Sequence, residues 1–332
     1  MNGVTARQLV WSDPLIQKQS DNFIAVADEL HDLRTGSTPE ALFFQRVFQQ
    51  KQRHAGHQGV FIATPSGRLL ASGTTYTADS VTALIEKSLV AWTRLPVAER
   101  YDPDEPLLTE QASGRAEDFY PEDGLVLRVT TRDLPAASLD DERIPRWHRY
   151  FLWLDRDEML AMLPSRLEPG QKHVVPRSSS ARLATLALLD KGLVDGFTKP
   201  FRDSDVEQAQ LELTVVEATS SEVRLQITGS TSTKTRDAQA FYGNMPQYEQ
   251  IPAYRGVRTK ILGNAVFDRA SNRFSRFDMV AVGLRFGGAY VGRPPDDWNE
   301  KPIGFSLTVG NGSPAERIAP EFPERYPWII TR

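Results

Sequence analysis

Two histidines three residues apart are the first side chains in this 332-residue chain whose types and spacing suggest chemistry. His54 and His57 belong to the sequence HAGH, and on one helix such a pair could bind the same metal ion. Neighbouring glycines favour a loop instead, so additional ligands would have to come from elsewhere, with Asp28 and Glu29 as candidates. A metal- or cofactor-dependent enzyme is therefore one hypothesis, and solvated loop histidines are the simpler one.

A second candidate is an aromatic cluster around one histidine. His148 lies in PRWHRYFLWL, close in sequence to Trp147, Tyr150 and Trp153. Aromatic rings beside a histidine can line a ligand pocket, so these four are candidate ligand-binding residues. The alternative is an apolar core in which the histidine is simply hydrogen-bonded.

Several other chemistries are excluded or disfavoured. The chain contains no cysteine, which excludes disulfides, thiolate metal sites, a cysteine nucleophile and a CxxC redox pair. His173 precedes three serines, Ser178 to Ser180, but no GxSxG elbow accompanies them, so a serine hydrolase is not expected. The stretch GLRFGGAYVGRP lacks the Lys-Ser/Thr of a phosphate loop. Glycines within a strand mark curvature instead, and a curved sheet favours a binding cavity.

Composition and charge limit the partners. The net charge is −4 and no basic block is present, so we expect no nucleic-acid binding. No apolar stretch approaches the roughly 20 residues of a membrane span, and the N-terminus lacks a basic region followed by an apolar run. We expect a soluble cytoplasmic protein, with a periplasmic location open if a signal peptide was removed. The oligomeric state stays open.

The first hundred residues alternate between segments that predict strands and segments that predict helices. NFIAVADEL predicts a buried strand, and PEALFFQRVFQQ predicts a helix capped by Thr38 with Pro39 at its first position. GVFIATPSGRLLAS predicts two short strands joined by a tight turn. The following helix begins at Thr77 or Asp79 and carries an apolar stripe that includes Val81 and Ile85.

This order of strand, helix, hairpin and helix over residues 10 to 95 resembles the second half of a thioredoxin fold. ATPSGRLLASGT in particular is similar to the hairpin of that family. The redox pair of the family is missing, as is the proline that usually precedes the hairpin. The resemblance therefore implies a degenerate, redox-inactive domain, from which no catalytic residue carries over. The whole layout also resembles uncharacterised bacterial two-domain proteins.

The remaining sequence predicts a second domain rich in strands. Residues 97–122 are rich in Pro, Asp, Glu and Gly and predict a linker between domains 1–96 and 123–332. A helix should start at Asp155 with Glu158 in a capping box, and a second helix should be capped by serine near Ser178 and end at Gly192. Two long hairpins after residue 205 favour an antiparallel sheet, open or partly closed, and Phe277, Met279 and Ala281 should share one face.

The sequence thus predicts an α+β protein: a degenerate thioredoxin-like domain, a helical segment and a curved antiparallel sheet. The function we expect is non-catalytic binding or scaffolding, with no cofactor. The partner would be a protein or peptide, or a small apolar ligand held by the sheet. The metal- or cofactor-dependent enzyme is the alternative.

Overall fold

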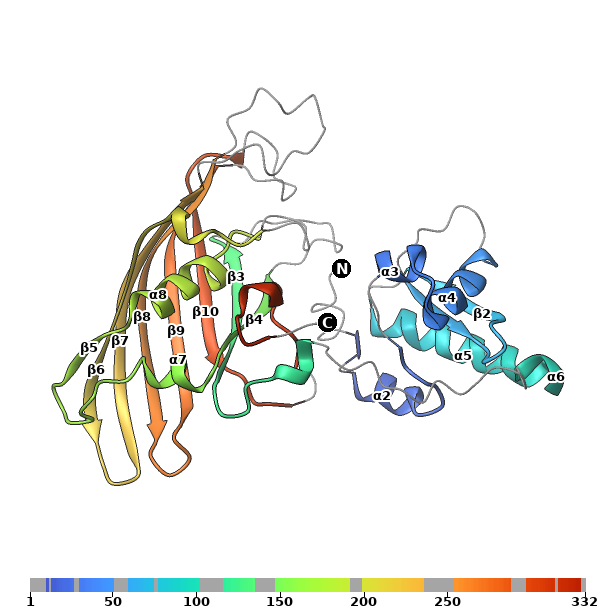
Figure 1. The fold of residues 1–332 in the computed structure, drawn as a ribbon, viewed down its shortest axis with the longest axis horizontal. Coiled ribbons are helices and arrows are strands. Elements are labelled where there is room, and N and C mark those ends of the chain that lie inside the picture. Colours follow the sequence, from blue (N-terminus) through green and yellow to red (C-terminus); the bar gives the residue numbers. More distant parts are fainter. Residues whose placement is uncertain are drawn as a thin grey trace. The chain divides into compact units, whose positions relative to one another are not determined.

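The chain forms two compact units, Gly3–Ala112 and Ser113–Arg332. The division falls within the expected linker, which also contains the short helices α6 (Val97–Arg100) and η2 (Ala116–Phe119). Figure 1 gives the fold of each unit. The computed structural model describes residues 10–11, 13–26, 30–50, 59–74, 77–101, 116–134, 147–191, 199–235, 254–287, 297–313 and 316–329.

Unit 1 consists of helices around a hairpin. The helices are α2 (Pro14–Ser20), α3 (Leu30–Thr35), α4 (Pro39–Gln49), α5 (Ala78–Arg94) and α6, and the strands are β1 (Val60–Ala63) and β2 (Leu69–Gly73). Thr38 caps α4 as expected, since its hydroxyl oxygen accepts from the Ala41 amide at 3.3 Å. Thr77 caps α5 in the same way. The cap of α2 is Asp13, whose carboxylate accepts from the Leu15 amide at 2.8 Å.

Helices cover both faces of the hairpin because its apolar side chains alternate. Val60 and Ile62 pack in a cluster with Val81 and Ile85 of α5. Phe61 points to the other side, where its ring lies 5.4 Å from that of Phe44 in α4. The two helices therefore enclose a small three-layer core.

The strand expected in NFIAVADEL is not formed in the part that the structure describes. Residues 22–26 are irregular, and α3 begins at Leu30. The side chains of Ile24 and Val26 are 89% and 75% exposed, so the prediction of a buried strand is wrong for these residues. Apolar composition alone suggested burial there, but packing leaves only Phe23 against the core. A thioredoxin-like arrangement is accordingly not confirmed.

Unit 2 is built on one antiparallel sheet with the strand order β4-β3-β10-β9-β8-β7-β6-β5. The predicted hairpins are confirmed, with residues 219–221 and 269–272 as their turns. The strands are β3 (Leu125–Asp133), β4 (His148–Leu154), β5 (Lys172–Val174), β6 (Val206–Ala218), β7 (Glu222–Thr235), β8 (Arg255–Asp268), β9 (Arg273–Gly287) and β10 (Lys301–Val309).

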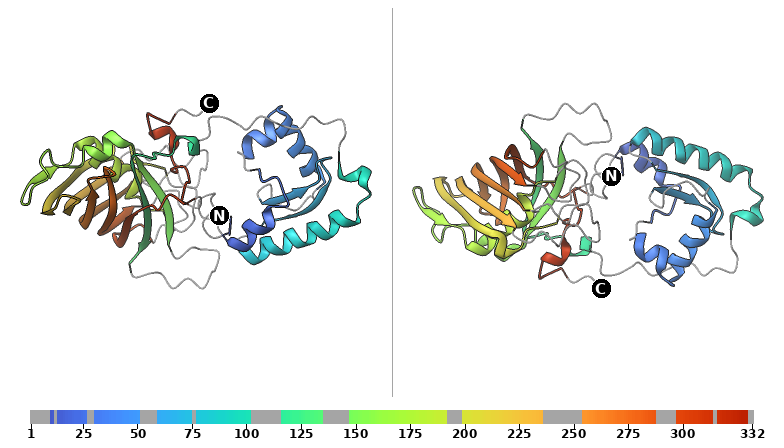
Figure 2. Two further views of the ribbon diagram at one scale, coloured as in Figure 1. Left: turned by 90° about the horizontal axis from the view of Figure 1, so that it is seen from below. Right: turned by 90° about the horizontal axis from the view of Figure 1, so that it is seen from above.

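The sheet curves around a helical segment, which Figures 1 and 2 let the reader follow. The π-helix η3 (Leu183–Ala187) contacts β4 near one edge of the sheet and also β6 and β7 near the other. Four strands separate β4 from β7 in the sheet, so a five-residue helix can touch both only if the sheet bends toward it. We call the face toward η3 the inner face and the opposite one the outer face.

Side-chain alternation assigns residues to these two faces. Phe277, Met279 and Ala281 of β9 are buried on the inner face, as the sequence predicted. Phe274 lies an odd number of residues from Phe277 and is nevertheless also buried, because the pairing of β8 with β9 shifts between Val266 and Phe267.

The inner face is covered by α7 (Arg156–Leu160), α8 (Arg177–Arg182) and η3, which together we call the helical cover. The predicted capping box of α7 is confirmed: Asp155 accepts from the Glu158 amide at 2.8 Å, and Glu158 accepts from the Asp155 amide at 3.1 Å. The serine cap is wrong, because α8 begins at Arg177 after Pro176. The chain then continues as a π-helix, in which the Leu188 amide donates to the Leu183 carbonyl at 3.1 Å.

The C-terminal segment, Glu316–Ile329, packs on its own unit. Trp328 stacks on Trp153 of β4 with ring centroids 6.1 Å apart, and Tyr326 meets Trp328 edge to face at 5.7 Å. None of the described helices is long and apolar enough to cross a membrane.

Candidate apolar binding site

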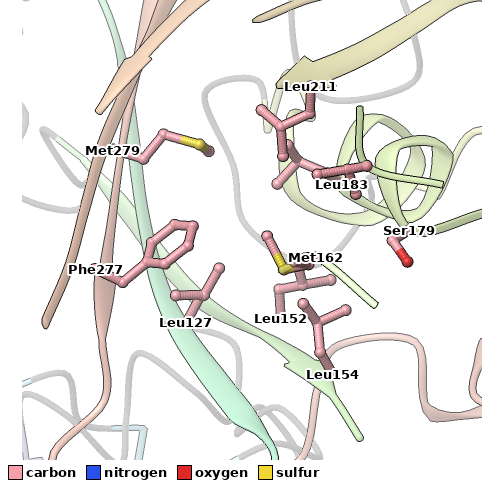
Figure 3. A pocket seen from close by; sticks show the side chains of 10 residues that line it. Leu127, Leu152, Leu154, Met162, Ser179, Leu183, Leu211, Phe277 and Met279 are labelled. Carbon is pink, nitrogen blue, oxygen red and sulfur yellow. The ribbon is translucent and has the colours of Figure 1, made fainter. Parts of the chain in front are cut away.

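An apolar void lies between the helical cover and the inner face of the sheet (Figure 3). Its volume is about 10 Å³, close to the room needed by one water molecule. The residues that line it come from four strands, from the cover and from the segments next to α7 and β5: Leu127, Leu152, Leu154, Met162, Val175, Ser179, Leu183, Leu211, Phe277 and Met279.

The side chains that line the void are almost all apolar. Ser179 is the one polar side chain among the lining residues, and none of them is ionisable. Such a wall cannot hold an ion or stabilise a developing charge, but it excludes water and favours apolar surface. Met162 and Met279 face the void from opposite layers, and their unbranched side chains can repack around occupants of different shape.

Strand periodicity explains how the sheet supplies its part of the lining. Met279 is 2% exposed on the inner face, whereas the next residue, Val280, is 48% exposed on the outer face. Leu152 and Leu154 alternate with Trp153 along β4, where Trp153 points to the outer face but is covered by Trp328. Val280 can therefore serve as an outward control for Met279.

The cover is tied to the sheet by a few polar contacts. The Tyr150 hydroxyl of β4 donates to the Ala187 carbonyl of η3 at 2.6 Å. Within the cover, Arg182 forms an ion pair with Glu158 at 2.9 Å. Burial raises the pKa of Glu158, and the Arg182 charge opposes that shift. The cover thus rests on the sheet mainly through apolar contacts.

The aromatic cluster predicted from the sequence is divided between the two faces. His148 and Tyr150 point to the inner face, and Trp153 points to the outer face. Trp147 precedes β4 and is largely exposed. The four side chains do not converge on one pocket, because the segment is a strand and its side chains alternate.

The predicted metal ligands His54, His57, Asp28 and Glu29 lie outside the described residues. Within the residues that the structure does describe, no group of three or more His, Asp or Glu side chains could hold a metal ion. His173 is on β5, with its Nε2 atom 2.9 Å from the Ala161 carbonyl oxygen.

Sequence reasoning missed a set of buried charges on the inner face. The guanidinium of Arg285 bonds to the carboxylates of Asp133 and Asp297 at 2.9 Å each. The guanidinium of Arg255 lies over the ring of Phe201 at 4.4 Å, and burial lowers its pKa to about 10, against the opposing charges of Asp190 and Asp205. Strand alternation could have revealed Arg285. It lies an even number of residues from Met279 on the same strand, so the two side chains point to the same face.

The polar cluster and the apolar void occupy different parts of the inner face. Along β9 the inward positions run from Phe277 and Met279 at the void to Arg285 three inward positions further on. The inner face therefore combines an apolar part with a charged part in which Arg285 is paired with two carboxylates.

Comparisons with protein-family models, with curated proteins and with solved structures find no match to this chain.

Proposed function

We propose that unit 2 binds an elongated apolar ligand, such as a hydrocarbon chain, between the inner face of its sheet and the helical cover. The observation that carries this proposal is the apolar void, walled by both layers and bordered by methionine side chains from each. A void of about 10 Å³ is too small for such a ligand, so binding requires the cover to move away from the sheet.

Two features support a movable cover. A sheet that bends around a short helical segment leaves a closed apolar interior when the segment is in place and an open groove when it is displaced. The π-helix in that segment is a rare and strained form of helix that often occurs at functional sites.

The test is to fill the void from the sheet. Met279→Trp should weaken binding of a fluorescent long-chain fatty acid at least about tenfold, because the indole takes up space that the ligand needs. Val280→Trp adds the same ring to the adjacent outward position and should leave the affinity unchanged.

Equal affinity of both variants, or no binding by the original protein, would contradict the proposal. Circular dichroism of each variant checks that the fold is retained. Leu183→Ala, which enlarges the void from the side of the cover, should strengthen binding and thus gives an opposite change at the same site.

For unit 1 we propose a second function: a redox-inactive, degenerate thioredoxin-like module that binds a protein or peptide. It is supported by the lack of cysteine and by the exposed apolar side chains of Ile24 and Val26 on irregular backbone. A photo-reactive phenylalanine at Ile24 should cross-link to one discrete partner. The same residue at Leu42, which is exposed on helix α4, should not; equal labelling at both positions would contradict the proposal.

A further inference from the structure

The C-terminal segment contacts the helical cover on both sides of the π-helix. Arg182 immediately precedes η3, and Lys191 follows it by four residues. Both cations are bound by residues of Glu316–Ile329, which lie more than 120 positions away in the sequence.

The contact of Lys191 is the more buried of the two. Its side chain is 1% exposed, and the ammonium bonds to both carboxylate oxygens of Glu321, which is itself 15% exposed. The ring of Tyr150 on one side and that of Phe322 on another lie 5.1 and 5.9 Å from Nζ. In such surroundings the Lys191 ammonium depends on the Glu321 carboxylate, because water cannot take the place of that carboxylate.

Arg182 is held differently. Its guanidinium lies 5.0 Å from the ring centroid of Tyr326 and is paired with Glu158 of the cover. Tyr326 is in turn hydrogen-bonded to the backbone of Trp153 in β4. The C-terminal segment therefore connects the sheet to both ends of η3.

Leu183, the first residue of η3, lines the apolar void and lies between these two contacts. We propose that the C-terminal segment is a clasp that holds η3 closed over the void, and that release of Lys191 from Glu321 opens the binding site. This inference rests on the proposed function of unit 2, since it assigns the regulation of the same site.

The clasp can be tested without any ligand, by hydrogen–deuterium exchange of the intact protein. Glu321→Gln removes the charge that pairs with Lys191 and should speed exchange of the amides of residues 183–189 at least about tenfold. Glu316→Gln is the matched control: Glu316 belongs to the same segment and is also buried, but its partner is Arg128 of β3. It should leave exchange in η3 unchanged.

The amides of β7 and β8 serve as the internal reference for global unfolding. The clasp would be overturned if the amides of η3 exchange as slowly in Glu321→Gln as in the original protein. It would also be overturned if Glu316→Gln accelerates their exchange as much as Glu321→Gln does. If Glu321→Gln does not fold, Phe322→Leu, which removes only a ring next to Lys191, should give a smaller acceleration confined to η3.

Ligand kinetics then separate the two proposals. A faster association rate of the fluorescent fatty acid with Glu321→Gln supports both. If η3 exchanges faster in Glu321→Gln but no fatty acid binds, the clasp is supported and the apolar-ligand function is overturned. Fatty-acid binding with unchanged exchange and rate overturns the clasp alone.

Discussion

Arg285 is a fully buried cation, and its surroundings determine what it contributes. Its guanidinium satisfies two carboxylates and a backbone carbonyl at once, which offsets the free energy of removing it from water. Arg276, on the same strand, forms an ion pair with Asp278 in which the two side chains are 69% and 44% exposed.

The two arginines should therefore differ strongly on substitution. Arg285→Met should lower the free energy of unfolding by about 3–5 kcal/mol, because the partly buried carboxylates of Asp133 and Asp297 lose the cation between them. Arg276→Met should change it by about 0–1 kcal/mol, since water screens the exposed pair. Urea unfolding measures both, and equal effects would contradict this assignment.

Glu158 predicts a pH dependence of stability. Burial raises its pKa in the folded state, so the folded protein holds this proton more tightly than the unfolded chain does. The resulting stabilisation is fully present below the unfolded pKa of about 4.5 and is lost as pH rises through the folded pKa.

Glu158→Gln removes that titration. The free energy of unfolding of the original protein, minus that of the variant, should therefore be larger at pH 4 than at pH 7, by about 1.4 kcal/mol per unit of pKa shift. Urea unfolding at several pH values measures the difference. A difference that grows with pH would mean that attraction by Arg182 lowers the pKa of Glu158 more than burial raises it.

At the scale of elements, glycine allows the strands of the sheet to approach one another. A Cβ atom at Gly283 of β9 would meet the backbone of Arg258 and Thr259 in β8. At Gly304 of β10 it would meet only the end of the Leu134 side chain, which can move.

Gly283→Ala should accordingly lower stability by about 1–3 kcal/mol, since a backbone clash cannot be relieved by a rotamer change. Gly304→Ala should stay within about 0.5 kcal/mol. Thermal or urea unfolding of the two variants checks this. Equal tolerance of both would show that β8 can shift away from β9.

The sequence was sufficient for elements whose signals are local. The caps at Thr38 and Asp155 and the inward side of β9 follow from hydrogen-bonding groups and from period-two alternation, which need no distant contact. The candidate site was harder to predict. Leu211 and Met279 line one void only because the sheet bends, and Leu183 reaches it only because the cover packs on the inner face.

Failures of the sequence interpretation have equally specific causes. Trp153 was grouped with His148 because neighbours in sequence were taken as neighbours in space, but the two side chains point to opposite faces of β4. Ile24 and Val26 were expected inside because they are apolar, but no element of the described unit covers them. Strand alternation decides the first case and tertiary packing the second, and the local pattern of residues 24–26 does not reveal that packing.

At the scale of the whole molecule, the two units have separate cores. Ile85 belongs to the cluster of unit 1 that contains Val81 and Ile62. Ile85→Ala should lower the stability of that unit by about 2–5 kcal/mol through loss of buried methyl groups.

Hydrogen exchange should then accelerate in α5 while β7 and β8 of unit 2 keep their protection, because each unit has its own core. Leu225→Ala in β7 provides the reciprocal control, with loss of protection expected in unit 2 alone. Parallel changes in both units would mean that they unfold as one cooperative body.

The edges of the sheet have a consequence for aggregation. In the part of the chain that the structure describes, the edge strand β5 spans only three residues, and the adjacent β6 is interrupted by two irregularities, near Val206 and Val215. A second molecule cannot align a long strand along such an edge. At the other end, Trp328 covers Trp153 of β4. Proteolytic loss of the segment that contains Trp328 would therefore expose the Trp153 ring on the edge strand β4, and a trimmed protein should aggregate sooner than the intact one.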